Sequence, residues 1–205
     1  MVKVDLHVHS SASFDCTVEP QEVGDRCWRL GLAPVFLTDH NTIEGAARLR
    51  GAGQLEVVVG EEVMTTEGEL IGLFLSSEIP QGLTAREATT RIKAQGGLVY
   101  IEHPYDPHRR HLSEEAIEEI AEEIDIVEVW NGRSDDRINQ KAVQLCDLLG
   151  AAQGAGSDAH LLGDIGRVYV ETEAFDGAVD FVAKLRRGKI VKRRSGLHLP
   201  KLRRP

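Results

Sequence analysis

The sequence has few cysteines. It has three, Cys16, Cys27 and Cys146, which is an odd number and too few for a disulfide framework. No two of them have C-x-x-C spacing. These counts exclude a disulfide-rich secreted scaffold, so we expect reduced thiols and a cytoplasmic location.

Long hydrophobic runs are also absent. No apolar stretch approaches the roughly 20 residues that a membrane-spanning helix needs. The chain opens with alternating apolar and polar residues rather than a basic segment followed by an apolar one, so we expect neither a secretory signal nor a membrane partner. Hydrophobic residues make up 41% and charged residues 28% of the 205 residues. This is an ordinary composition for a soluble globular protein with one substantial core.

Acidic residues are missing from the C-terminal segment. Residues 184–205 hold ten Lys and Arg and no acid, whereas residues 1–183 hold 14 Lys and Arg against 33 Asp and Glu, a formal net charge of −19. An acidic body repels nucleic acid and suits a site that concentrates cations. We expect a single domain over residues 1–190 and a basic tail over residues 191–205. The tail is either solvated and frayed or bound to phosphates or to an acidic surface of the same protein.

Strand and helix signals alternate along the chain, and no internal repeat or linker interrupts them. Short connections between alternating units predict a parallel sheet, with one antiparallel departure after a turn at Gly68. The patterns predict strands at 2–8, 34–37, 55–59, 69–75, 98–101, 125–130, 151–155 and 167–171, and helices at 19–30, 42–51, 84–95, 113–123, 135–149 and 174–187.

Polar side chains gather at the ends of these strands. An open sheet would spread them along a line, whereas a closed α/β barrel brings the carboxyl ends of its strands to one face, where active sites lie. The clusters are His7/His9, Asp39/His40, Glu61/Glu62, His103, Asn131 and Asp158/His160. We therefore predict an α/β fold, a distorted TIM-like (βα)7 barrel with its active site at the C-terminal strand ends.

The first strand carries a pair of histidines. Alternation places His7 and His9 on one face, where they either meet solvent or share a ligand. With His40, His103, His160 and at least three carboxylates, the strand ends hold too many ligands for one four-coordinate zinc. The pattern favours a cluster of two or three divalent ions, Mn, Fe or Zn.

Five motifs, in this order, resemble the PHP family, the polymerase and histidinol phosphatase superfamily. They are Asp5-Leu6-His7-Val8-His9-Ser10, Thr38-Asp39-His40-Asn41-Thr42, Gly60-Glu61-Glu62, Glu102-His103-Pro104 and Gly156-Ser157-Asp158-Ala159-His160. The resemblance implies a distorted (βα)7 barrel with a trinuclear metal site and phosphoesterase chemistry through a metal-activated water.

The resemblance also implies a ligand set. His7, His9, Glu62 and Asp158 would hold one metal, and Glu62 would bridge to a second that His103 also binds. Glu62 is chosen over Glu61 because the family pattern is Gly-x-Glu. Glu69 stands where many members have a histidine, and is either a ligand or solvated. Asp15, in Phe14-Asp15-Cys16 rather than the family's Ser-Asp-Gly, would hold a third metal with His40 and His160.

Other residues are candidates for supporting roles. Arg109, Arg110 and Arg167 would bind phosphate, against the alternative of surface solvation. His103 or Asp39 would assist proton transfer, unless Asp39 orients a metal-bound imidazole. Asp5 would orient His7 and His9, and Asn131 would either support the metal ligands or contact the substrate. We assign His108, His111 and His198 to the surface and Trp130 to the core rather than to the site.

Together, these observations favour a metal-dependent phosphoesterase acting on a small phosphorylated metabolite or nucleotide. One alternative is an exonuclease-like hydrolase of short oligonucleotides, 3'-5' or 5'-3', with the basic tail steering the polyanion. Others are a PHP-fold metal-binding protein without catalysis and a hydrolase of a non-phosphate bond such as an amide.

Overall fold

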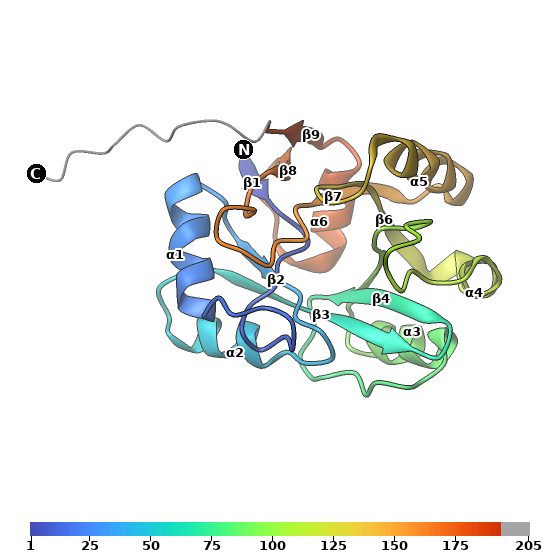
Figure 1. Ribbon diagram of the computed structural model, residues 1–205, viewed down its shortest axis with the longest axis horizontal. Helices are drawn as coiled ribbons and strands as arrows, with labels where there is room; N and C mark the ends of the chain where they lie inside the picture. The colour runs from blue at the N-terminus through green and yellow to red at the C-terminus, as the bar shows by residue number, and fades with distance from the viewer. Residues whose placement is uncertain (194–205) are drawn as a thin grey trace, which may run out of the picture.

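The computed structural model describes residues 1–193, so His198 and most of the basic tail lie outside the described residues. Strands and helices follow the predicted order, and one strand that was not predicted, β9 (Lys189–Lys192), comes after the last helix (Figure 1). The strands are β1 (Val2–Val4), β2 (Val35–Leu37), β3 (Val57–Thr65), β4 (Gly68–Leu73), β5 (Leu98–Ile101), β6 (Ile124–Asn131), β7 (Ala152–Gly156), β8 (Val168–Thr172) and β9 (Lys189–Lys192). The helices are α1 (Pro20–Leu30), α2 (Glu44–Gly51), α3 (Ala85–Ala94), α4 (Glu114–Glu119), the short 3-10 turn η1 (Ala121–Glu123), α5 (Asp136–Leu149) and α6 (Gly177–Leu185).

Local signals account for the helix ends. Glu19 and Glu22 form a capping box before α1, which begins at Pro20, and Gly31 ends the helix in the left-handed conformation. Thr84 caps α3 by accepting a hydrogen bond from the Glu87 amide. The acidic helix expected over 113–123 is shorter, because α4 ends at Glu119 and only the 3-10 turn continues the chain to β6.

The main sheet has six strands in the order β2-β3-β4-β5-β6-β7 and curls into a half-barrel, as Figure 1 shows. Neighbours β2/β3, β5/β6 and β6/β7 are parallel, whereas β3/β4 and β4/β5 are antiparallel. The α/β class and the antiparallel departure are therefore confirmed. A complete (βα)7 barrel is not, because β1, β8 and β9 form a separate antiparallel sheet.

Residues 5–9 connect the two edges of the curled sheet. On one side the Leu6 amide donates to the Ala155 carbonyl and the Asp158 amide to the His7 carbonyl; on the other the Thr38 amide donates to the Val8 carbonyl. The regular strand predicted for 2–8 ends at Val4. The rest of the segment stays extended between β7 and β2, held by isolated hydrogen bonds.

The core divides between the two faces of the curled sheet. One face packs against α1, α2, α3 and α5 through residues such as Val23, Leu49, Ile92 and Leu145. The other holds Val4, Leu6 and Tyr100, with Phe181 from α6 lying 5.2 Å from Phe36 between ring centroids. The three cysteines are buried and form no disulfide.

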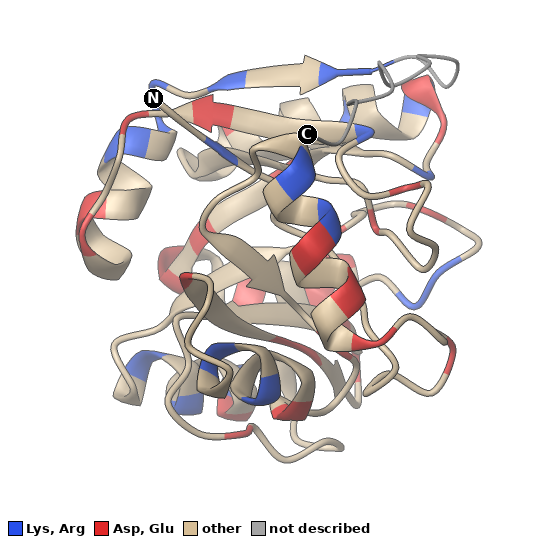
Figure 2. Ribbon diagram, turned by 90° about the vertical axis from the view of Figure 1, so that its left-hand side faces the viewer, with Lys and Arg blue, Asp and Glu red and all other residues tan. Residues whose placement is uncertain are grey.

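Lys and Arg lie mainly on the helices and at strand ends, whereas Asp and Glu also occur on strands in the interior (Figure 2). Among the described residues, no helix combines the length and the apolar character required to cross a bilayer. Strand β9 pairs with β8 as far as Lys192, two residues past the boundary expected at residue 190.

A substitution at Gly156, at the end of β7, tests how closely residues 5–9 must approach the sheet. A Cβ on Gly156 would lie 2.3 Å from the His7 Cβ and 2.8 Å from a Glu128 oxygen. We expect Gly156→Ala to lower the free energy of unfolding by about 1–3 kcal/mol, measured by urea denaturation, because two backbone segments must separate. Gly163→Ala is the matched control, since no atom lies within 4 Å of its new Cβ. Equal stabilities of the two variants would show that the segment has room to move.

Candidate metal centre

Four side chains from three parts of the chain meet at one buried point. His7 Nε2 lies 3.0 Å from His9 Nε2, and the two nitrogens lie 3.1 and 3.2 Å from Glu62 Oε2. Asp158 Oδ1 lies 3.8 and 3.7 Å from the same nitrogens. All four residues are at most 2% exposed. Two ring nitrogens and two carboxylates therefore face one another with little access for water.

Outer hydrogen bonds determine which ring nitrogens carry hydrogen. His7 Nδ1 lies 3.2 Å from Glu128 Oε1, so we assign its hydrogen to Nδ1, where it is donated to the carboxylate. The Ser13 hydroxyl donates to Asp39 Oδ1 and lies 3.2 Å from His9 Nδ1, so His9 also carries its hydrogen on Nδ1. Both Nε2 lone pairs then point at each other and at Glu62. Three acceptors that converge without a donor need positive charge between them, either a proton or a metal ion, and metal-binding histidines are oriented in this way.

The electrostatic field of the site also favours positive charge. Burial lowers the pKa of His7, but Glu128, Glu62 and Asp158 outweigh it and hold the pKa well above its usual value. Burial raises the pKa of Asp158, yet His7, His9 and His103 bring it below the ordinary range. The carboxylates are thus ionised and attract a cation to the point where the imidazoles meet. The donor set fits a divalent transition metal.

A second group shares Glu62. Its other oxygen, Oε1, lies 3.2 Å from His103 Nε2, so the two oxygens of one carboxylate face different imidazoles. Glu69, on β4, is buried, and its Oε1 lies 3.6 Å from His40 Nδ1. Burial first, and then Glu62, raise the pKa of Glu69 to about 8. The structure thus turns Glu69 into the centre rather than toward solvent.

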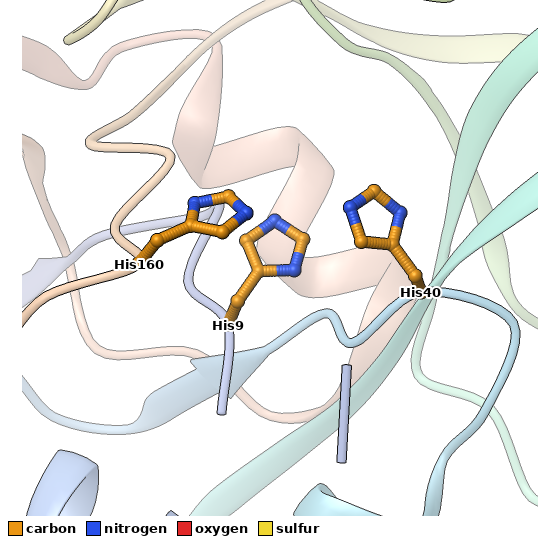
Figure 3. A group of neighbouring side chains, drawn as sticks. All are labelled: His9, His40 and His160. Carbon is orange, nitrogen blue, oxygen red and sulfur yellow. The ribbon is translucent and has the colours of Figure 1, made fainter. Parts of the chain in front are cut away.

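A third group lies at the mouth of the site. His160 Nε2 and His40 Nε2 lie 3.0 and 3.6 Å from Asp15 Oδ2. Figure 3 shows the rings of His40 and His160 on either side of His9, with centroids 4.7 and 4.3 Å from it. Burial lowers the pKa of both outer rings, which favours the neutral form that binds metals. Asp15 thus lies beside its expected partners despite its unusual sequence context.

The three groups open into a cavity of about 340 Å³ with arginines on its rim. Arg109 pairs with Asp106 and, through Nε, with Asp158 at 2.9 Å. Arg133 Nη1 lies 2.9 Å from His160 Nδ1 and is half-exposed, and Arg110 is exposed on the same rim. Phe14 and His108 also line the cavity. His108 is exposed, as expected, but it lies at the cavity rather than on a remote surface.

Several predicted roles do not match these positions. Asp5 accepts hydrogen bonds from the Ser157 amide and hydroxyl and from the Gly166 amide, so it anchors the loop after β7 rather than the imidazoles. Asp39 is buried and reaches His9 through Ser13, so its position fits the expected orienting role rather than proton transfer to a substrate. Arg167 pairs with Asp164 and does not line the cavity. Asn131, in contrast, does fit the supporting one of its two expected roles, because it donates to Glu128 and Asp158.

Sequence reasoning missed two residues that organise the centre. Glu128, fully buried on β6, accepts from the Tyr100 hydroxyl, the His103 amide and the Asn131 side chain as well as from His7. Its signal is a lone acid inside the apolar run Ile-Val-Glu-Val-Trp. Arg133 follows Asn131-Gly132, and no motif marks it. Backbone strain gives a further sign of function, since His103 and Asp158 have φ angles of 29° and 51°.

The Glu128 carboxylate provides a direct test of the centre. We expect Glu128→Gln to weaken Mn²⁺ binding roughly 10- to 100-fold, since the charge behind His7 is lost and an amide group faces the donors. Calorimetric titration with Mn²⁺ measures this. Tyr100→Phe is the control, because it removes a different donor and leaves the His7 contact in place, and its effect is expected to be smaller. Equal affinities of wild type and Glu128→Gln would contradict the assigned orientation of His7.

Comparison with known proteins finds a sequence relative and a matching family, and also solved structures with a similar fold. The uncharacterized protein MJ0417 of Methanocaldococcus jannaschii is 36% identical over 178 residues, 83% of this chain and 70% of that protein. A family described as PHP-associated matches residues 136–190, which run from α5 into β9.

Solved structures share the fold at low sequence identity. A two-domain protein from Bacteroides vulgatus, containing a predicted PHP-like metal-dependent phosphoesterase, superposes with a TM-score of 0.76 at 20% identity over 94% of this chain. The match spans 65% of that protein, so this chain is similar to part of it. The lesion-specific endonuclease PfuEndoQ from Pyrococcus furiosus has a TM-score of 0.64 at 15% identity, over 92% of this chain and 57% of that one. Taken with the matched family and the motif order, these relatives show that the chain belongs to the PHP domain family.

Proposed function

We propose that this protein is a metal-dependent phosphoesterase that hydrolyses a phosphate ester of a small metabolite or nucleotide. The observation that carries the proposal is the meeting of imidazoles and carboxylates at the base of a cavity with arginines on its rim. Carboxylates alone would repel a phosphate, whereas a cation-loaded centre beside guanidinium groups attracts one. The residues 1–190 would act as the single metal-dependent domain.

The proposed centre has three parts, for two or three ions of Mn, Fe or Zn. His7, His9, Glu62 and Asp158 would hold one ion, Glu62 and His103 a second, and Asp15, His40 and His160 a third. Glu69 would contribute between the second and third. Bound divalent ions polarise phosphoryl oxygens and lower the pKa of a water toward neutrality.

The protein's own residues would position the ester. Arg133 and Arg110 are exposed on the cavity rim. Arg133 contacts His160 and Asp158 through Nη1, and its Nη2 is the group we propose for phosphoryl oxygens. Arg109 is already paired with Asp106 and Asp158, so it contributes mainly by holding the Asp158 carboxylate in place. Glu128 and Ser13 keep the two inner imidazoles in the tautomer that presents Nε2. Together these contacts pre-organise the site before substrate binds.

Metal-dependent hydrolysis is tested with a panel of phosphate esters. We expect Mn²⁺-loaded protein to release phosphate from the ester. We expect His9→Ala and Asp158→Ala to lower the rate by at least about 100-fold, because removing a proposed ligand should cost more than the roughly 10- to 100-fold lost when a ligand's hydrogen-bond partner is removed. Treatment with a chelator should abolish the activity and added Mn²⁺ restore it. Equal rates in wild type and both variants would identify a contaminant, and metal binding without hydrolysis would favour a non-catalytic protein.

Arg133, which lines the cavity, and Arg167, which does not, provide a matched pair. We expect Arg133→Ala to lower kcat/KM for the best ester roughly 10- to 100-fold, the value of one or two charge-assisted hydrogen bonds. Arg167→Ala should leave it unchanged, because that guanidinium pairs with Asp164 outside the cavity. The reverse result would restore the phosphate-binding role that the sequence suggested for Arg167.

A nuclease is the second candidate. A neighbouring cavity of about 390 Å³ shares His108, Arg109 and Arg133 with the first and continues toward Asp135. This extra room suits the second nucleotide of an oligonucleotide, and the endonuclease with a similar fold acts on nucleic acid. Comparing release of mononucleotide from a labelled oligonucleotide with release of phosphate from mononucleotides distinguishes the two candidates. The basic tail falls largely outside the described residues, and its removal tests whether it steers the polyanion.

A further inference from the structure

Glu102 is a buried carboxylate without a hydrogen-bond partner. It follows β5, its exposed fraction is 0%, and neither side-chain oxygen meets a donor within the described part of the chain. A charged or neutral carboxyl group buried in this way is unfavourable unless something compensates it. The metal ligands that the family resemblance implies do not include this residue.

The position of Glu102 supplies a reason for its burial. An oxygen of Glu102, an oxygen of Glu62 and a ring nitrogen of His103 all lie within 4.8 Å of one another. The Glu62 oxygen and the His103 nitrogen are themselves 3.2 Å apart. Two carboxylates and an imidazole, one from β3 and two from the end of β5, therefore converge, which is the arrangement that a divalent cation stabilises.

A neighbouring glutamate shows that burial alone does not produce this arrangement. Glu61 is also 0% exposed, but it precedes Glu62 on β3 and points to the opposite face of the strand. There Glu61 Oε2 accepts a hydrogen bond from the Ile79 amide at 2.8 Å. Glu61 thus has a structural partner in the protein, and Glu102 does not.

We propose that Glu102 is a ligand of a divalent cation, which it binds together with Glu62 and His103. The proposal rests on the proposed metal centre and adds a carboxylate to its second site. Two carboxylates and one imidazole form a harder donor set than the His7–His9 pair with its carboxylates. Harder oxygen donors suit Mn²⁺ better than Zn²⁺, so this second site would favour Mn²⁺ more strongly than the first.

Glu102→Gln and Glu61→Gln form the matched pair for the experiment. Each keeps the side-chain size and removes one buried carboxylate. After loading with Mn²⁺ and desalting, metal content per chain is measured by plasma mass spectrometry, and affinity by calorimetric titration. We expect Glu102→Gln to lose one equivalent, or to bind it at least about tenfold more weakly, while Glu61→Gln retains the wild-type stoichiometry.

Thermal stability separates a ligand from a structural residue. In chelator-treated protein, Glu102→Gln should melt at or above the wild-type Tm, because the Glu102 carboxyl group has no hydrogen-bond partner to lose. On adding Mn²⁺ its Tm should rise less than that of wild type. A metal-free Glu102→Gln that is less stable than wild type, or unfolded, would overturn the assignment. Unchanged Mn²⁺ stoichiometry and affinity would overturn it too, even if the wild type hydrolyses esters. A wild type that binds Mn²⁺ without hydrolysis contradicts the proposed function and leaves the Glu102 assignment standing.

Discussion

The placement of residues 5–9 between β7 and β2 is the constraint on which the site depends. Their backbone hydrogen bonds reach both edges of the curled sheet, and the same five residues carry His7 and His9. If this segment separated from either edge, the two imidazoles would lose their positions relative to Glu62 and Asp158. Apolar burial of Leu6 and Val8 stabilises the segment, and Gly156 permits its close approach to β7. The contacts that join the two edges of the sheet are thus the same contacts that place His7 and His9 in the site.

The buried charges are compatible with a stable protein because their partners are arranged in layers. The outer layer consists of Glu128, which accepts four donors, and of Asp39, which accepts from Ser10 and Ser13. These carboxylates are satisfied by the protein. In the inner layer, Glu62 and Asp158 face the imidazoles, and Asp158 is also held by Asn131 and Arg109. This division is the reason that we propose the outer carboxylates as supports and the inner ones as ligands.

The sequence predicted more of the centre than of its surroundings. Residues at strand ends could be grouped in advance, because period-two alternation and parallel strands bring them to one edge; His7, His9, Glu62, His103 and Asp158 do lie together. Roles that depend on a partner far away in the sequence could not be predicted from such patterns. Asp5 bonds to Ser157, 152 positions away, and Glu128 lies in the middle of a strand. Arg133 and Arg167 both follow a glycine, but Arg133 contacts His160 and Asp158 at the cavity, whereas Arg167 pairs with Asp164 outside it.

The conformations of His103 and Asp158 connect stability to function. Both have positive φ angles, and both follow the carboxyl ends of parallel strands, where the chain must turn sharply. Such backbone costs about 1–3 kcal/mol per residue, and it persists only where surrounding contacts over-determine it. The His103 amide donates to Glu128 and the Asp158 amide to the His7 carbonyl, so each strained turn is held by a residue of the same centre. The strain directs both side chains to the point where Glu62 lies. The strained backbone thus lowers the free energy of unfolding in order to place these side chains. A bound cation would raise that free energy again, because it binds only the folded state.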